Sequence, residues 1–393
     1  MNIWEEILKN QDYLIRMRRH FHQNPELGWK EYRTAEMIRN ELTTFHIPFC
    51  TVGETGTVAV LKGTQETPVI GLRCDIDALP IEEMGEKPYT SMEKGRMHAC
   101  GHDSHIAMLL TAAKVLSEHR DELACTVKFI FQPAEEVATG SRSGAKEILA
   151  SGLVDDLSTV CGMHIFPTID TGKISVDPGP RFTSASILKL QIIGKSGHGA
   201  MPHLSVDPIY TACKVVDALQ GIVSRETDPR EAAVISICSF RCGQASNIID
   251  ETAYLEGTIR TFAPELQAAI PQQIERVVAG VCSACRAQYK LEIDNNYPVT
   301  SNDAACSKLA AEAVAELWGE EALCEYSKTP GGEDFSYFLQ RFPGVFAFVG
   351  CRNEKKDCVY PLHHNLFNLD EDAMLYGAAF YVLYTLKAQD AFQ

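Results

Sequence analysis

The hydrophobic and polar positions of the chain alternate between two spacings, one typical of strands and the other of helices. Short apolar runs bounded by Gly and Pro predict strands near residues 57–62, 68–73, 125–132 and 158–164. Apolar residues spaced three and four apart predict helices near residues 4–23, 34–45, 99–118 and 142–150. Because strands and helices alternate, this part of the chain predicts a three-layer α/β/α domain with a parallel sheet.

The pattern changes near residue 183. Alternating, half-exposed strand patterns occur in SASILKLQIIGKS, AVISICSFRCG, ETAYLEGTIRTF and KLEIDNNYPV. Helical patterns occur in DPIYTACKVVDALQGIVSR and in residues 264–288, so this region predicts two helices on four strands. The earlier rhythm returns with helices near 302–318 and 370–387 and a strand near 344–350. We therefore expect a discontinuous α/β domain, residues 1–182 plus 297–393, interrupted by an inserted α+β domain at 183–296.

The composition is that of an ordinary globular protein. Hydrophobic residues make up 45% of 393 residues, and no apolar run reaches the roughly 18–20 residues that a membrane span needs. The net charge of −16 argues against binding to nucleic acid or to an anionic membrane. Fourteen scattered cysteines without a visible secretory signal predict reduced thiols and a cytoplasmic location. The CxxC pair Cys282 and Cys285 lies in a helical pattern without a second pair, so we interpret it as structural.

The window MHACGHDSH, residues 97–105, is the most informative part of the chain. Thiolate and imidazole groups are ligands that suit Zn²⁺, Mn²⁺, Ni²⁺ or Co²⁺. Cys100 and His102 are two residues apart at the predicted start of a helix, so both side chains can reach one ion from a tight turn. The alternative interpretation is a helix-capping loop with a buried cysteine.

Two acidic windows follow predicted strands. Glu135 and Glu136 come after the strand at 125–132, and Asp75 and Asp77 come after the strand at 68–73. Loops at the carboxyl edge of parallel strands are where α/β proteins place ligand sites. Because neighbouring residues point in different directions, one glutamate can bind metal while the other holds a water molecule as general base. The alternatives are a solvated acidic pair at a helix start and an Asp turn.

Two single histidines complete this set. His164 ends an apolar strand pattern, and His363 lies in YPLHHNLF. A lone histidine at the end of a strand is usually structural. Together with Cys100, His102 and one glutamate, however, these histidines make five ligands, which is enough for two metal ions that share one bridging group.

These windows resemble the aminoacylase, hippurate hydrolase and auxin-amino-acid amidohydrolase branch of the co-catalytic metallopeptidases. The matching motifs run in family order across nearly the whole chain: RRHFHQNPELGWKE, GLRCDIDALPIE, MHACGHDSHIAMLL, FIFQPAEE, GKSGHGAMPH, GTIRTF, GGEDFSYF and LHHNLFNLDE. The resemblance implies a catalytic α/β/α domain with an inserted α+β dimerisation domain. It also implies two divalent metal ions per subunit, with Mn²⁺, Zn²⁺, Ni²⁺ and Co²⁺ as the candidates.

The resemblance implies a metal-binding role for five residues. Cys100 takes the position of the bridging ligand, and the remaining ligands are His102, Glu136, His164 and His363. The adjacent His364 is the alternative to His363, which the register of the following FNLDE favours.

Five further positions carry implied roles in catalysis and substrate binding. Glu135 is the general base, and Asp77 orients the first metal ligand. His198, in the insert, reaches the active site of the partner subunit, and Asn247 and Arg260 hold the substrate carboxylate or the tetrahedral intermediate.

The role of Asp75 stays open at this point. It falls where more distant relatives place a ligand histidine, and His102 takes over that function from another loop.

The activity implied is hydrolysis of the amide bond of N-acyl amino acids by a cytoplasmic homodimer. A metallo-dipeptidase or aminopeptidase that uses the same dinuclear site is the alternative. A non-catalytic metal-binding protein is disfavoured because Glu135 accompanies all five expected ligands.

Overall fold

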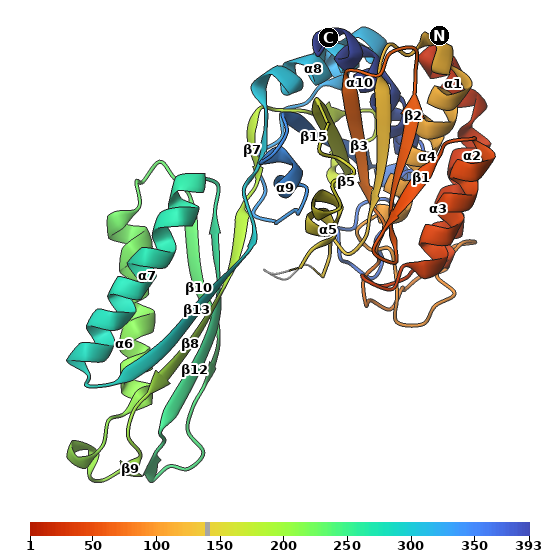
Figure 1. Ribbon diagram of the computed structural model, residues 1–393. Coiled ribbons are helices and arrows are strands. Elements are labelled where there is room, and N and C mark those ends of the chain that lie inside the picture. Colours follow the sequence, from red (N-terminus) through yellow and green to blue (C-terminus); the bar gives the residue numbers. More distant parts are fainter. Residues whose placement is uncertain (138–141) are drawn as a thin grey trace.

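The computed structural model describes residues 1–137 and 142–393, and its two main sheets are of unequal size (Figure 1). The larger sheet has seven strands in the order β1-β2-β4-β3-β5-β15-β6. Their bounds are Phe49–Val52, Gly56–Lys62, Thr126–Gln132, Val69–Asp75, Thr159–Asp170, Gly344–Arg352 and Ile174–Ser175. Helices cover both faces of this sheet, so the fold is α/β with the three layers that the sequence predicted.

The central strands of the large sheet are parallel, as predicted, but its margins are not. β3 pairs in parallel with β4 and β5, and β5 pairs in parallel with β15. In contrast, β2 is antiparallel to both β1 and β4, and β6 is antiparallel to β15. The short connection between β1 and β2 explains why these two strands are antiparallel, because a turn of a few residues can join only antiparallel strands.

One face of the sheet carries most of the helices. The layer on this face consists of α1 (Ile3–Lys9), α2 (Gln11–Gln23), α3 (Tyr32–Thr44), α4 (His102–Glu118), α8 (Ala304–Trp318) and α10 (Ala373–Ala391). The other face is covered by α5 (Gly144–Ala150) and the short α9 (Ser336–Leu339). α4 and α10 are buried along most of their length, which explains why their sequences are apolar on every side.

The N-terminal segment differs from its prediction in one respect. The sequence predicted one helix over 4–23, and the structure divides it into α1 and α2 at Asn10. The Asn10 side chain donates a hydrogen bond to the carbonyl oxygen of Glu6 at 2.9 Å. Asn side chains compete with the helix backbone in this way, which is why they favour helix ends over helix interiors.

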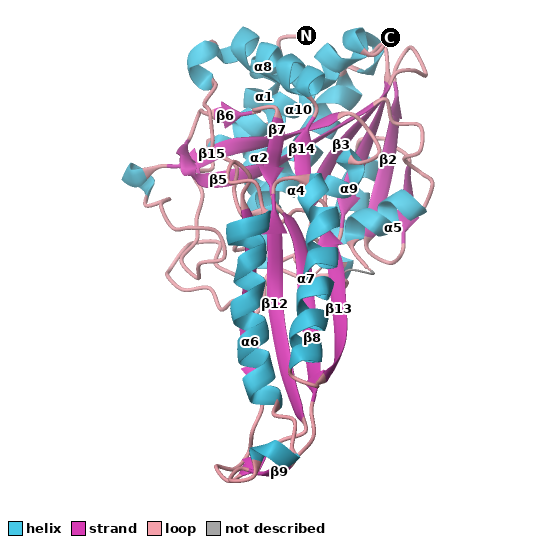
Figure 2. Ribbon diagram, turned by 90° about the vertical axis from the view of Figure 1, so that its left-hand side faces the viewer, coloured by secondary structure: helices cyan, strands magenta, loops and turns pink. Residues whose placement is uncertain are grey.

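Residues 184–297, called the insert below, form the second sheet. Its four antiparallel strands have the order β10-β12-β8-β13, with bounds Ala233–Arg241, Thr252–Thr261, Ser184–Ile193 and Gln288–Tyr297. α6 (Pro208–Gly221) and α7 (Pro264–Ala284) pack on one face through a separate apolar cluster, and a π-helical turn, Ile222–Glu226, follows α6. The other face of this sheet carries no helix of the insert (Figures 1 and 2).

Two small ribbons mark the ends of the insert. β7 (Gly179–Phe182) pairs with β14 (Thr300–Asn302) where the chain passes between the two sheets. β9 (Gly197–His198) pairs with β11 (Ile248–Ile249) at the tip farthest from the large sheet (Figure 1). Four 3₁₀ turns complete the described elements: Arg120–Glu122, Pro202–Leu204, Glu320–Ala322 and Glu354–Lys356. Among the described residues, no helix combines the length and apolar character needed to span a bilayer.

Candidate dinuclear metal site

Cys100 and His102 are presented by a sharp turn at the start of α4. Gly101 between them adopts the left-handed conformation, with φ of 86°, and precedes the first helical residue. A Cβ atom at this position would lie 2.5 Å from the Ile165 side chain on β5. Glycine is therefore required both by the backbone conformation and by the close approach of β5. The turn directs the thiol and the imidazole toward the same buried space.

The three histidines expected to bind metal each present Nε2 to this space. His102 Nδ1 lies 2.9 Å from the carbonyl oxygen of Asp77 and 3.3 Å from its carboxylate, so Nδ1 carries the proton. His164 Nδ1 lies 2.7 Å from the carbonyl oxygen of Ile165, and its Nε2 lies 3.3 Å from Cys100 Sγ. His363 Nε2 lies 3.2 Å from Glu136 Oε1. A hydrogen bond through Nδ1 fixes the tautomer and leaves the Nε2 lone pair free for a cation.

Two of the five candidate groups of ligand atoms among the described residues share Cys100. Those of Cys100, His102 and His164 lie within 4.8 Å of one another, and so do those of Cys100, Glu136 and His363. The Nε2 atom of His102 is buried and has no hydrogen-bond partner among the described residues. A buried nitrogen of this kind is costly unless something binds it. This arrangement of thiol, imidazole and carboxylate groups fits divalent cations, which these residues would hold with Cys100 common to both groups.

The loop that carries Glu135 and Glu136 is held by side chains from elsewhere in the chain. The Asp77 carboxylate accepts hydrogen bonds from the backbone N–H groups of Glu135 and Glu136, at 3.2 and 3.0 Å. Glu31 accepts a hydrogen bond from the Ala134 N–H at 2.8 Å. Ala134 itself has a φ of 54°, which is unfavourable for a residue with a side chain. The surroundings thus hold this loop in a strained conformation, a frequent property of functional sites.

Glu135 and Glu136 differ in their electrostatic surroundings. Burial, followed by repulsion from Glu333, raises the pKa of the Glu135 carboxyl well above its ordinary value. Burial acts in the same direction on Glu136, but contacts with His363 and His102 lower its pKa overall. Neighbouring carboxyls whose pKa values move apart are suited to different tasks. Glu135 is suited to accept a proton, and Glu136 is suited to remain an anionic ligand.

Asp75 belongs to a further candidate group for a metal ion, with His102 and His105, and its carboxylate also has partners within the protein. Its two carboxylate oxygens are occupied by Arg73, at 2.9 Å, and by His105 Nδ1, at 2.6 Å. His105 Nε2 accepts a hydrogen bond from the backbone N–H of Ile165 at 3.1 Å, so neither nitrogen of His105 is free. This chain of hydrogen bonds ties β3, α4 and β5 together beside His164.

Several residues of the site were not predicted from the sequence. Arg73 is fully buried and contacts Glu333 and Asp334 at 3.0 Å each, in addition to Asp75. Arg73, His105 and Glu333 all lie inside motifs that resemble the family. Their place in these motifs was the sequence feature that could have identified them as site residues. Single residues in these motifs could not be assigned contacts because their partners come from distant segments.

His363 and His364 lie in different surroundings. His363 belongs to the ligand group with Cys100 and Glu136 and has a left-handed backbone with φ of 63°. The His364 ring instead stacks on Tyr360 with a centroid distance of 5.0 Å, and its Nδ1 accepts a hydrogen bond from the Leu366 N–H. The structure therefore brings His363, rather than His364, to the metal-binding groups.

The three candidate residues of the insert do not lie together. Arg260 pairs with Ala185 at the end of the insert nearest the large sheet. His198 lies in β9 and Asn247 hydrogen-bonds to the Gly199 N–H, so both occupy the distal tip (Figure 1). The ten residues of β8 separate these two ends by roughly 30 Å. His198 and Asn247 thus cannot reach the metal-binding groups of their own chain in this arrangement.

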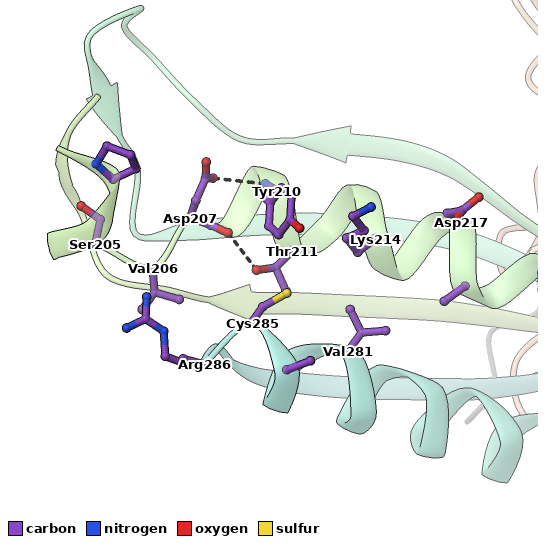
Figure 3. Close-up of a pocket in the computed structure, with 13 residues that line it drawn as sticks. Ser205, Val206, Asp207, Tyr210, Thr211, Lys214, Asp217, Val281, Cys285 and Arg286 are labelled. Carbon is purple, nitrogen blue, oxygen red and sulfur yellow. Dashed lines mark hydrogen bonds between the residues drawn. The ribbon is translucent and has the colours of Figure 1, made fainter. Parts of the chain in front are cut away.

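A groove of about 710 Å³ lies away from the metal-binding groups, between α6 and α7 (Figure 3). Its lining residues include Tyr210, Lys214, Cys285 and Arg286, and none of the predicted site residues. Cys282, the other cysteine of the CxxC pair, is buried and both thiols are free. We assign the catalytic chemistry to the metal-binding groups, because the groove has no comparable set of ligands.

Comparison with known proteins agrees with this geometry. Residues 71–387 match the model of the peptidase family M20/M25/M40. The chain is 38% identical to N-acetylcysteine deacetylase of Bacillus subtilis, over 95% of this chain and 98% of the relative. It is 36% identical to IAA-amino acid hydrolase ILR1-like 4 of Arabidopsis thaliana, over 94% and 84%.

A solved structure of similar fold is that of the Bacillus subtilis YXEP protein, described as a dinuclear metal-binding peptidase from the M20 family. The TM-score is 0.85 at 34% identity, and the match covers 97% of this chain and 98% of that one. The fold and the site thus define a hydrolase of the dinuclear metallopeptidase kind. The chain belongs to the peptidase family M20/M25/M40 and is an amidohydrolase-type enzyme.

Metal removal tests the role of the two ligand groups. We expect a chelator to abolish activity, because removal of the metal takes away the Lewis acid that polarises the substrate carbonyl. Added divalent metal should restore the activity. Cys100→Ala should lower the metal content of the purified protein, measured by elemental analysis. Cys161→Ala, which removes a buried thiol of β5 outside both groups, should keep the metal content of the wild type. Equal metal content in the two variants would contradict a ligand role for Cys100.

The opposite pKa shifts of the two glutamates predict separable effects. Glu135→Gln should retain metal and reduce kcat by roughly 10²–10⁴-fold, the usual effect of losing a general base. Glu136→Gln should reduce the metal content instead. Elemental analysis and steady-state kinetics of both variants distinguish the roles, and loss of metal from the Glu135 variant alone would reverse them.

Proposed function

We propose that the protein hydrolyses the amide bond of N-acyl amino acids. The observation that carries this proposal is the position of Glu135, buried beside two ligand groups that share Cys100. When bound, two divalent cations supply Lewis-acid chemistry that lowers the pKa of a water molecule and polarises the acyl carbonyl. Cys100, His102, Glu136, His164 and His363 would hold these cations.

Proton transfer and substrate binding then fall to other residues of the chain. Glu135 takes a proton from the attacking water and returns it to the leaving amine. Asp77 keeps His102 in the tautomer that binds metal and holds the Glu135 loop. Arg260 pairs with the substrate carboxylate. This role is supported by its half-buried guanidinium, for which no ion pair occurs among the described residues.

We infer that the active enzyme is a homodimer in which the partner subunit's His198 stabilises the oxyanion and the partner subunit's Asn247 assists it. The roughly 30 Å between the two ends of the insert supports this inference. The insert also exposes many of the large apolar side chains that lie on the surface of the described chain: Ile187, Met201, Leu204, Ile209, Tyr210, Val234, Phe240, Ile248 and Tyr254. Exposed apolar residues in this number are typical of protein–protein interfaces. The fourteen free cysteines support the predicted cytoplasmic location.

A substrate panel tests the proposed reaction. We expect turnover of N-acetyl and other N-acyl amino acids, and little turnover of dipeptides with a free α-amine, each assayed with Mn²⁺, Zn²⁺, Co²⁺ and Ni²⁺. The reason is that a free ammonium group needs its own acceptor, whereas an acyl group needs an apolar pocket. Preferential cleavage of free-amine dipeptides would instead identify a metallo-dipeptidase or aminopeptidase, the alternative that uses the same site.

Subunit mixing tests the role of His198. His198→Ala should reduce kcat by roughly 10²–10³-fold, the usual cost of losing one oxyanion donor, with unchanged metal content. Mixing this variant with Glu135→Gln creates heterodimers that have one complete site. The mixture should recover about a quarter of the wild-type activity, because half of the dimers are mixed and each has one of two sites intact. Absence of recovery after verified subunit exchange would show that His198 does not act across the dimer.

A further inference from the structure

One hydrogen bond links the insert directly to the loop of the proposed general base. Tyr297, the last residue of β13, donates its hydroxyl proton to the carbonyl oxygen of Glu135 at 2.9 Å. The N–H groups of the same loop are held by Glu31 and Asp77, which both belong to the α/β part of the chain. Of these three anchors, only Tyr297 belongs to the insert.

An irregularity in β13 aims Tyr297 at this loop. Leu291 and Ile293 of β13 point toward the helices of the insert, and regular alternation would place Tyr297 on the same face. The pairing with β8 shifts between Asn295 and Tyr297, so that Asn296 is an extra residue. A bulge of one residue inverts the faces that follow it. Tyr297 consequently pairs with Ala185 and lies on the helix-free face of the sheet.

The same row of the sheet contains the proposed carboxylate-binding residue. Arg260 pairs with Ala185 from the other side, so Arg260, Ala185 and Tyr297 lie next to one another across three strands. Gly332, which precedes Glu333, packs against all three. A Cβ atom at Gly332 would lie 2.8 Å from the Tyr297 ring, 3.3 Å from Arg260 Nη1 and 3.4 Å from the Ala185 Cβ. Glycine at this position lets the segment that carries Glu333 approach these three residues closely.

We propose that Tyr297 is a positioning residue that sets the Glu135 loop relative to Arg260, and thereby couples the placement of the insert to the general base. The proposal rests on the proposed function, in which Arg260 holds the substrate carboxylate while Glu135 transfers the proton. Arg260 and the Glu135 loop are then both held through the same row of three neighbouring residues of the insert sheet. A substrate bound at Arg260 therefore presents its amide at a fixed distance from Glu135. A defined distance between binding group and base is a main source of catalytic rate.

The chain offers a matched pair of variants for the test. Tyr297→Phe removes only the hydroxyl that contacts Glu135. Tyr337→Phe removes a hydroxyl from the same junction, where Tyr337 of α9 donates to the carbonyl oxygen of Asn296 without touching the base. We expect Tyr297→Phe to reduce kcat roughly 3- to 10-fold, the range for one lost hydrogen bond, with unchanged KM and metal content. Tyr337→Phe should keep the kcat of the wild type. Equal kcat losses in both variants, or none in Tyr297→Phe, would overturn the proposal.

Hydrogen–deuterium exchange supplies a readout that does not depend on catalysis. In Tyr297→Phe the backbone amides of Glu135 and Glu136 should exchange faster than in the wild type, and in Tyr337→Phe they should not. Unchanged exchange in Tyr297→Phe would overturn the positioning role. If exchange responds as expected but no substrate of the acyl-amino-acid panel is hydrolysed, the proposed function fails while the link between Tyr297 and the Glu135 loop stands.

Discussion

The carboxylate of Asp77 is the interaction on which the rest of the site depends. It accepts the backbone N–H groups of Glu135 and Glu136 and lies 3.3 Å from His102 Nδ1. One side chain after β3 therefore connects the loop after β4 with the start of α4. Because ionised acceptors form the stronger hydrogen bonds, a buried aspartate can hold a strained loop in place where a neutral group could not. The candidate ligands and the proposed base are thus arranged around the carboxylate of a single residue.

The balance of buried charge explains the raised pKa values of Glu333 and Glu135 and the suitability of the site for cations. Arg73 is fully buried against three carboxylates, those of Asp75, Glu333 and Asp334. One positive charge does not compensate three negative ones in a medium of low dielectric constant. Burial, against the opposing effect of Arg73, raises the pKa of Glu333 to about 8, and repulsion from Glu333 contributes to the raised pKa of Glu135. An excess of buried acidic groups next to thiol and imidazole ligands favours divalent cations, and it makes Glu135 a stronger base than an exposed glutamate.

The insert gives the molecule its two-part form. Arg260 and Tyr297 lie at its near end, beside the Glu135 loop, and His198 lies at its far tip. The length of β8 sets this separation, because an extended strand cannot fold back on itself. In the proposed function, the insert therefore contributes to its own site through one end and to the partner's site through the other. The bulge before Tyr297 turns its hydroxyl toward the Glu135 loop, and Gly332 lets the segment before Glu333 pack on the same end of the insert.

The sequence by itself predicted the α/β class, which the structure confirms, because hydrophobic spacing is a local property of the chain. The resemblance of motifs such as MHACGHDSH and FQPAEE to the family gave the candidate ligands Cys100, His102, Glu136, His164 and His363. It left the role of Asp75 open, because the hydrogen bond between Asp75 and His105 joins two separate segments of the chain. For the same reason it did not find Tyr297 or Arg73. The spacing of apolar residues also did not predict the break between α1 and α2, where the Asn10 side chain hydrogen-bonds to the helix backbone. Nor did it predict the antiparallel strands at the margin of the large sheet, which depend on how the chain connects the strands. Only the tertiary structure decided which buried groups meet, because hydrogen bonds and charges act over a few ångströms regardless of separation along the chain.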